Sequence, residues 1–292
     1  ALIAGLVIYS FIIGVNFNDW WKGRSVIPVD HIVTSLGISR ICAQCAKIMY
    51  LLMKRFFLSR QNFDVNFITS IVYFFFTYVN FWLTSLLSIV FCLKISNFHT
   101  RLFLYLRGMI VRRTVYFIVA SVVFSAFSCL MSLTLPSGLY RDGLYNTIMP
   151  NLSVHCTTIN YVYTFTVGAI IPLLLYCISS GLLFSSLYHH TTKMTSNLSI
   201  NLETYYSLMR FVFVTFIYNT LYFIGHFVCV FYYYFYCMSI GWIHIALDIL
   251  PLLHSSYLIY RTPKLRSQMF KGLQYLSDFV SQRKDMETRE NM

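Results

Sequence analysis

Among the ionisable side chains that stand within otherwise apolar stretches of the chain, five are candidates for function: Arg40, Lys47, His244, Asp248 and His254. Such groups are costly to bury, so each is a candidate for binding a polar ligand atom or for linking helices. His244 and Asp248 are four residues apart, which places them on one face of a helix. A histidine beside a carboxylate can hold a proton and offer a polar contact to a ligand. The alternative for this pair is a hydrogen bond between helices, with no ligand.

Arg40 stands deep inside its apolar stretch, where its charge is difficult to expose to water. We predict that it is a conformational hub that joins its helix to the neighbouring helices, with Ser255 as a partner. The alternative is a side chain that extends to a lipid headgroup. His254 is predicted to belong to the same hub and to pack against the helix at 161–188. For Lys47, extension to the headgroups and a functional role both stay open.

Polar side chains at the middle of two other apolar stretches complete a candidate ligand site. Pockets for small organic molecules are mostly apolar and carry a few placed polar groups, and 18% of this chain is aromatic. We therefore predict a pocket that opens to the outside between the helices. The predicted ligand-binding residues are Thr77, Tyr78, Asn80, Tyr218, Asn219, His244 and Asp248.

No arrangement typical of a catalytic centre is found in the sequence. It contains no HExxH motif, no pair of CxxC motifs at zinc spacing and no phosphate-binding glycine loop. Cys42 and Cys45 have CxxC spacing, but they lie inside an apolar stretch without further ligands. We therefore expect no enzymatic activity, no cofactor and no metal site.

The composition shows which kind of fold must position these groups. The chain has 292 residues, of which 58% are hydrophobic and 11% charged, against about 25% charged in a typical soluble domain. A soluble fold of this length cannot bury so much apolar surface. The composition excludes a soluble enzyme, a disordered chain and a small secreted disulfide domain. It predicts an all-α membrane protein, because the uncharged stretches reach 27 residues or more without the alternation of a β-barrel.

The charged residues divide the apolar sequence into spans of about 20 residues or more, the length that crosses a bilayer as a helix. The stretch between Arg210 and Arg261 would form a helix about 75 Å long, so it must contain two spans. The aromatic run at 232–236 marks their division. We predict one domain over 1–292, with a C-terminal amphipathic helix at about 263–280 on the inner leaflet. The predicted spans are 1–17, 31–53, 66–93, 114–135, 161–188, 207–232 and 237–259.

The distribution of Lys and Arg predicts the orientation of the seven spans. Sixteen of these residues fall on the side of the C-terminal tail and four on the other side. By the positive-inside rule, the N-terminus is extracellular and the C-terminus cytoplasmic in a multi-pass protein of the cell membrane. The net charge of +12 is then explained by topology and by attraction to anionic lipid. We expect no nucleic-acid partner.

Two glycosylation sequons and two cysteines fall in loops for which this orientation predicts the side of the membrane. Asn151 lies on the outer side and is a predicted glycosylation site, whereas Asn197 lies on the inner side. Cys156 and Cys237 both lie on the oxidising outer side. Whether they form a disulfide stays open. The first span begins at Ala1 without an initiator Met, so we expect the chain to be trimmed at its N-terminus.

Motifs in four spans occur in order along the chain. They are Leu36-Gly37-Ile38-Ser39-Arg40, then Phe91 to Phe98 (FCLKISNF), then Pro172 with Leu183 to Leu187 (LFSSL), then Pro251, His254-Ser255, Leu258-Ile259 and Lys264-Leu265. Together they resemble the type 2 (bitter) taste receptors, a family of G-protein-coupled receptors. The chain departs from that pattern at Tyr9 and at Thr77, where the family has Asn, and also at 201–206 and Thr262. It resembles a divergent member, and the vomeronasal type 1 pheromone receptors are the second candidate family.

The resemblance implies a seven-helix receptor that binds small, bitter organic agonists and activates a heterotrimeric G protein of the gustducin (Gi-like) type. It implies that agonist binding rearranges the fifth, sixth and seventh helices. The residues expected to face the G protein are Lys94, Asn97, Arg107, His190, Lys193 and Lys264. The plainer explanation of these charges is the positive-inside rule alone. A small transporter or channel is the alternative from another class, but it would need charged pathways or internal repeats, which we do not find.

Overall fold

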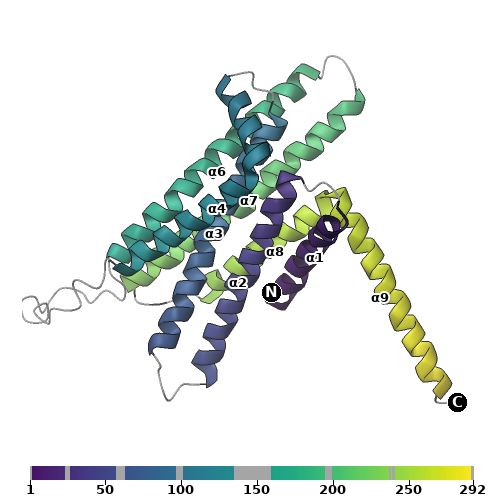
Figure 1. Cartoon of the computed structure of the whole chain (residues 1–292), viewed down its shortest axis with the longest axis horizontal. Helices are drawn as coiled ribbons and strands as arrows, with labels where there is room; N and C mark the ends of the chain where they lie inside the picture. Colours follow the sequence, from purple (N-terminus) through teal and green to yellow (C-terminus); the bar gives the residue numbers. More distant parts are fainter. Residues whose placement is uncertain are drawn as a thin grey trace, which may run out of the picture.

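The computed structural model describes residues 2–23, 27–56, 63–96, 101–134, 159–194, 199–236, 238 and 241–290. In these ranges every regular element is an α-helix (Figure 1). Seven of the described helices are long and apolar enough to cross a membrane. The predicted all-α bundle of seven spans is therefore confirmed. The helices are α1 (Leu2–Trp21), α2 (Pro28–Phe56), α3 (Phe63–Ile95), α4 (Arg101–Thr134), α6 (Ile159–Met194), α7 (Ser199–Tyr236), α8 (Gly241–Arg261) and α9 (Pro263–Glu290).

Most helices continue beyond the predicted spans, and α4 does so most. The predicted span begins at residue 114, whereas the helix begins at Arg101 and its part that is apolar enough to cross a membrane begins at Arg112. Residues 101–113 are therefore helical although they precede the predicted span. Charge marks where the chain leaves the hydrocarbon and does not mark where a helix ends, since Leu, Arg and Met are good helix formers in water. The backbone departs from helical geometry at Arg113 (φ −126°, ψ 27°), which divides α4 into two straight parts.

Helix α3 is the centre of the bundle, and α4 lies at its edge. Most of the α3 span is buried, whereas most of the α4 span is exposed, as expected for a helix that faces lipid. An aromatic cluster joins α3, α6 and α7. In it the rings of Phe81 and Phe223 stack with centroids 4.4 Å apart, and Phe165 packs edge-on against Phe81. A larger aliphatic cluster extends through the rest of the bundle and includes Leu265 of α9.

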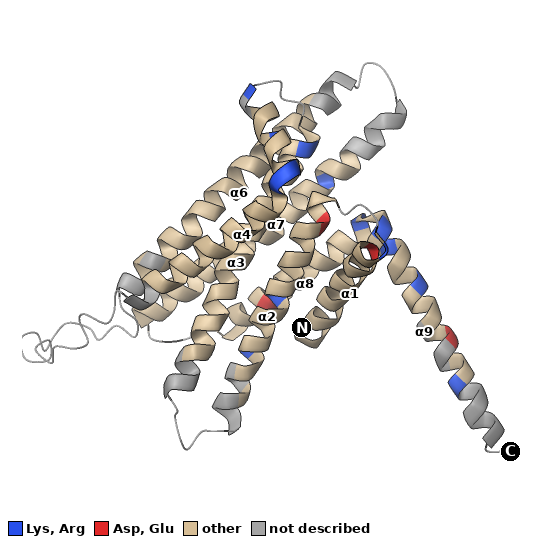
Figure 2. Cartoon of the chain, in the orientation of Figure 1, with Lys and Arg blue, Asp and Glu red and all other residues tan. Residues whose placement is uncertain are grey.

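Lys and Arg side chains gather at one end of the bundle, where α3 meets α4 and α8 meets α9 (Figure 2). We call this the basic end and the other the opposite end. Helix α9 begins at the basic end and runs across the bundle axis, away from the seven spans (Figure 1). Beyond its first turns α9 exposes Phe270, Leu273 and Tyr275. The predicted helix at 263–280 is therefore present but longer, and its position on the inner leaflet stays a prediction.

A polar contact joins α9 to the corner between α1 and α2. Lys264 Nζ lies 2.9 Å from Asp19 Oδ2 and 3.1 Å from Asp30 Oδ2, and it donates to Asn16 Oδ1 at 3.1 Å. Partial burial alone would lower the pKa of Lys264, but the bonds to Asp19 and Asp30 outweigh it and raise the pKa above its ordinary value. Because the folded state favours the protonated amine, this contribution is complete at neutral pH. It is lost only as the pH rises through the raised pKa.

Candidate functional site

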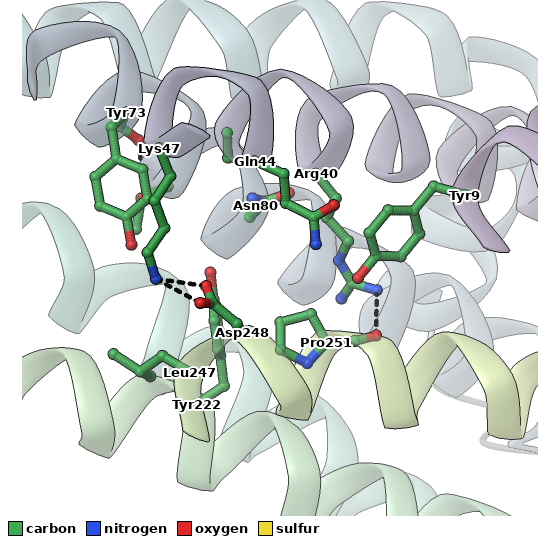
Figure 3. Close-up of a pocket in the computed structure, with 12 residues that line it drawn as sticks. Tyr9, Arg40, Gln44, Lys47, Tyr73, Asn80, Tyr222, Leu247, Asp248 and Pro251 are labelled. Carbon is green, nitrogen blue, oxygen red and sulfur yellow. Dashed lines mark hydrogen bonds and ion pairs between the residues drawn. The ribbon is translucent and has the colours of Figure 1, made fainter. Parts of the chain in front are cut away.

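A small polar cavity lies inside the bundle between α1, α2, α3, α7 and α8 (Figure 3). Its volume is about 30 Å³, enough for one or two water molecules. It contains two cations and one carboxylate in an otherwise apolar bundle. The lining residues are Tyr9, Arg40, Ala43, Gln44, Lys47, Tyr73, Thr77, Asn80, Tyr222, Leu247, Asp248 and Pro251.

Arg40 is buried, with 5% of its surface exposed, and it binds three groups of α8. Its Nη1 donates to Ser255 Oγ at 2.6 Å and to the Pro251 carbonyl at 3.3 Å, and it lies 3.3 Å from His254 Nδ1. The guanidinium also lies over the Tyr9 ring, 5.8 Å from its centroid, which adds a cation–π contact with α1. The contact with Ser255 is the one expected from the sequence. These partners hold the charge inside the bundle, so extension to a headgroup is excluded for Arg40.

Lys47 and Asp248 form an ion pair at the other end of the cavity. Lys47 Nζ lies 2.7 Å and 2.6 Å from the two carboxylate oxygens of Asp248 (Figure 3). The side chains are 17% and 18% exposed, so the pair is largely shielded from water. The sequence suggested His244 as the neighbour of Asp248, but His244 contributes only its backbone carbonyl, 3.5 Å from Lys47 Nζ. Lys47 is turned into the bundle by this partner and does not extend to the lipid surface.

The other predicted ligand-binding residues are divided between different places. Thr77 and Asn80 line the cavity. Asn80 also accepts a hydrogen bond from Ser39 Oγ of α2 at 2.5 Å. Tyr78 points to the other side of α3 and packs on Phe165, with ring centroids 5.9 Å apart. Tyr218 is half-buried on α7 and lies outside the residues that line either cavity.

Asn219 lines a second cavity of about 30 Å³, nearer the basic end, between α3, α6, α7 and α8. Its amide donates to Tyr176 Oη of α6 at 3.3 Å, and Tyr176 donates to the Thr215 carbonyl at 3.1 Å. His254 and Tyr176 line this cavity from α8 and α6, and the predicted packing of His254 against the helix that begins at Ile159 stays a prediction. Since its Nδ1 contacts Arg40, His254 lies between the two cavities.

Sequence reasoning missed four polar residues of the first cavity, Tyr9, Gln44, Tyr73 and Tyr222, and it did not identify the partner of Lys47. For that partner a signal was present. Lys47 follows Arg40 by seven residues, and Asp248 precedes Ser255 by seven, so each pair lies on one face two turns apart. If Arg40 meets Ser255 between antiparallel helices, Lys47 must come close to Asp248. The tyrosines carried no such signal because tyrosine is common throughout this chain.

The residues predicted to face a G protein lie at the basic end where the structure describes them. Lys94 and Arg107 are exposed. Lys264 is bound by Asp19 and Asp30, so its charge is already neutralised within the chain. Other predicted positions lie outside the described residues: Asn97, Asn151, Cys156 and Cys237, together with the side chains of His190 and Lys193.

Seven apolar helices around a buried polar cavity define the fold of the G-protein-coupled receptors. The crystal structure of squid rhodopsin superposes with a TM-score of 0.62 over 94% of this chain and 83% of that chain. The sequence identity is 10%, so this likeness concerns the fold alone. The seven described helices that are long and apolar enough to cross a membrane indicate a multi-pass membrane protein.

The family is shown by sequence. The model of the family "Taste receptor protein (TAS2R)" matches residues 1–277, and the chain belongs to this family. Taste receptor type 2 member 16 of Gorilla gorilla gorilla is 31% identical over 234 residues, which cover 75% of this chain and 76% of that protein. Taste receptor type 2 member 2 of Homo sapiens is 27% identical over 199 residues, 65% of this chain and 64% of that protein. The chain is therefore a chemosensory receptor and not an enzyme, and the vomeronasal alternative is set aside.

Proposed function

We propose that this receptor binds small, bitter organic molecules between its helices and activates a heterotrimeric G protein of the gustducin (Gi-like) type. The observation that carries the proposal is the cavity with Arg40 and the Lys47–Asp248 pair at its ends. Charges in an apolar bundle are costly, and they are typical of a functional site rather than of packing. Membership of the taste receptor family supports small-molecule ligands and G-protein coupling in general.

The size of the cavity bears on how an agonist would act. Sites for drug-sized ligands have volumes of about 300–1,000 Å³, whereas this cavity has about 30 Å³. An agonist would therefore fit only after α3, α7 and α8 move apart. A ligand shifts a conformational equilibrium by its difference in affinity for the two states. We infer that agonists stabilise an expanded state and that the structure is the contracted one.

We propose that the G protein binds at the basic end. Lys94 and Arg107 present positive charge there, and Arg261 donates to the Ser207 carbonyl at 2.8 Å, which ties α8 to α7. Movement of α8 by a ligand would therefore be transmitted to α7 at this end. The apolar surface of α9 supports membrane lipid as a second partner of the basic end.

The test is ligand-dependent G-protein activation in cells that express the full chain. We expect a panel of bitter plant compounds to contain agonists that dissociate a Gi-type heterotrimer, with no response from a Gs-type heterotrimer and none in untransfected cells. Ionic current or solute uptake through the protein, without any G-protein response, would favour the transporter or channel instead.

Orientation is tested with the two sequons. We propose that the N-terminus is extracellular, because the basic end then faces the cytoplasm. Glycosidase treatment of protein from mammalian cells should then lower its apparent mass, and Asn151→Gln should abolish this shift. Asn197→Gln is the matched control and should leave the glycan in place. Loss of the glycan in Asn197→Gln alone would mean that the topology is inverted.

A further inference from the structure

The charges in the first cavity do not balance. Asp248 neutralises Lys47 directly, at 2.6 Å. Within the described part of the chain, the groups that Arg40 contacts are neutral: a backbone carbonyl, a hydroxyl, an aromatic ring and an imidazole nitrogen. The imidazole Nδ1 must be unprotonated to accept a hydrogen bond from the guanidinium. The lining of the cavity therefore carries two cations and one carboxylate, a net charge of +1.

Buried hydrogen-bonding groups face the same space without a partner of their own. Tyr9 is 1% exposed and lies beside Arg40 and Ser255, yet its hydroxyl makes no hydrogen bond of ordinary geometry with the described residues. Gln44 is 8% exposed and lies on α2 between Arg40 and Lys47, facing the cavity (Figure 3). Its unpartnered Oε1 is an acceptor, so only its amide nitrogen can bind an anion. The unpartnered Tyr9 hydroxyl is a donor, and an occupant that accepts its hydrogen bond removes the cost of burying it alone.

The occupant that suits this lining is an anion. The excess positive charge attracts it, and the tyrosine hydroxyls and the Gln44 amide can donate to it. A cation would have to displace Lys47 from Asp248 and meet the charge of Arg40, which disfavours it. The volume of about 30 Å³ admits a carboxylate or a single halide ion but not the body of an organic ligand.

We propose that this cavity is an anion site that takes the carboxylate of an acidic organic ligand between Arg40 and Lys47. The rest of such a ligand extends toward the opposite end as the helices separate. A free halide could supply the same charge, and the experiment distinguishes the two sources. The inference that the anion belongs to an agonist rests on the proposed function, whereas the site itself does not.

The experiment measures the thermal unfolding midpoint of the full chain in neutral-lipid nanodiscs at constant ionic strength. The probes are benzoate, its neutral analogue benzamide, and chloride, each added to a buffer with isethionate as the background anion. Binding to the folded state alone raises the midpoint in a concentration-dependent way. We expect benzoate to raise the midpoint by a few degrees and benzamide to leave it unchanged. A rise with chloride equal to that with benzoate assigns the site to a free halide.

Three variants decide whether the effect comes from this cavity. Asp248→Asn removes the carboxylate and should lower the half-saturating benzoate concentration about tenfold. Lys47→Gln should raise that concentration about tenfold, and Lys271→Gln, an exposed charge on α9, should leave it unchanged. Each variant is compared with itself without ligand, so an altered stability does not obscure the result. If a variant does not fold, Gln44→Leu, which removes a donor but no charge, should raise the half-saturating concentration.

Equal effects of benzoate and benzamide would overturn the proposal. Loss of the benzoate effect in Asp248→Asn would also overturn the proposal, because binding would then require the carboxylate of Asp248, which should repel an anion. The measurement needs no G protein, so its outcome is independent of the signalling test. If benzoate binds but no compound of the bitter panel activates a G protein, the proposed signalling function fails and the anion site still stands.

Discussion

Arg40→Ala is expected to reach the cell surface in reduced amount and to change basal or agonist-driven signalling at least about tenfold, equivalent to about 1.4 kcal/mol. The substitution leaves Ser255 Oγ, His254 Nδ1 and the Pro251 carbonyl without their buried donor, at a cost of about 1–3 kcal/mol each. It also removes a cation whose insertion costs at least about 2.5–3.5 kcal/mol. The two effects partly cancel in folding, so folded protein should persist. If Arg40 is the conformational hub that we predict, they should not cancel in signalling, because the two receptor states would then hold the guanidinium differently.

Two further variants separate the charge of Arg40 from its geometry. Arg40→Lys keeps the charge but lacks the planar group with five donors, so it should not restore normal signalling. Ser255→Ala removes one hydrogen bond of the same hub and should have a smaller effect in the same direction. Surface expression by antibody labelling and G-protein activation are measured on the same cells. An Arg40→Ala protein with unaltered signalling would remove Arg40 from the mechanism.

Breaking the Lys47–Asp248 pair is expected to lower the stability of the receptor more than any exposed charge change. Lys47→Met or Asp248→Leu alone leaves one charge uncompensated in the bundle. Because the two side chains are 17% and 18% exposed, the cost should lie at the lower end of the range for a buried pair, about 3 kcal/mol. The thermal unfolding midpoint and the surface level should both fall. Lys271→Met, on the exposed part of α9, is the matched control and should change neither.

The double variant Lys47→Met/Asp248→Leu gives the decisive comparison. Replacing a buried ion pair by apolar residues of similar size is often neutral or stabilising, so the double variant should recover most of the lost midpoint. The double-mutant cycle should give a coupling of about 2 kcal/mol or more. If the double variant were as unstable as the sum of the single ones, the two side chains would not form a pair in the membrane.

Composition and charge were sufficient to predict the seven spans, because the apolar stretches have the length of one crossing, or of two between Arg210 and Arg261. The Arg40–Ser255 contact could also be predicted, since a deep cation needs a partner at the same depth. The pairing of Lys47 with Asp248 was missed, although Asp248 was singled out. Its prediction requires the relative register of α2 and α8, which is set by packing between helices rather than by either sequence alone. Tyr78 shows the same limit. It was predicted to line the ligand pocket, but its ring packs on Phe165 and does not line the first cavity.

The Lys264 contacts have a consequence for the order in which the receptor is made. Lys264 is 248 positions from Asn16 and 234 from Asp30, so a growing chain synthesises the acidic corner of α1 and α2 long before the cation that neutralises it. Until then Lys264 cannot neutralise Asp19 and Asp30. A polypeptide truncated within α8 would therefore lack the cation that contacts this acidic corner.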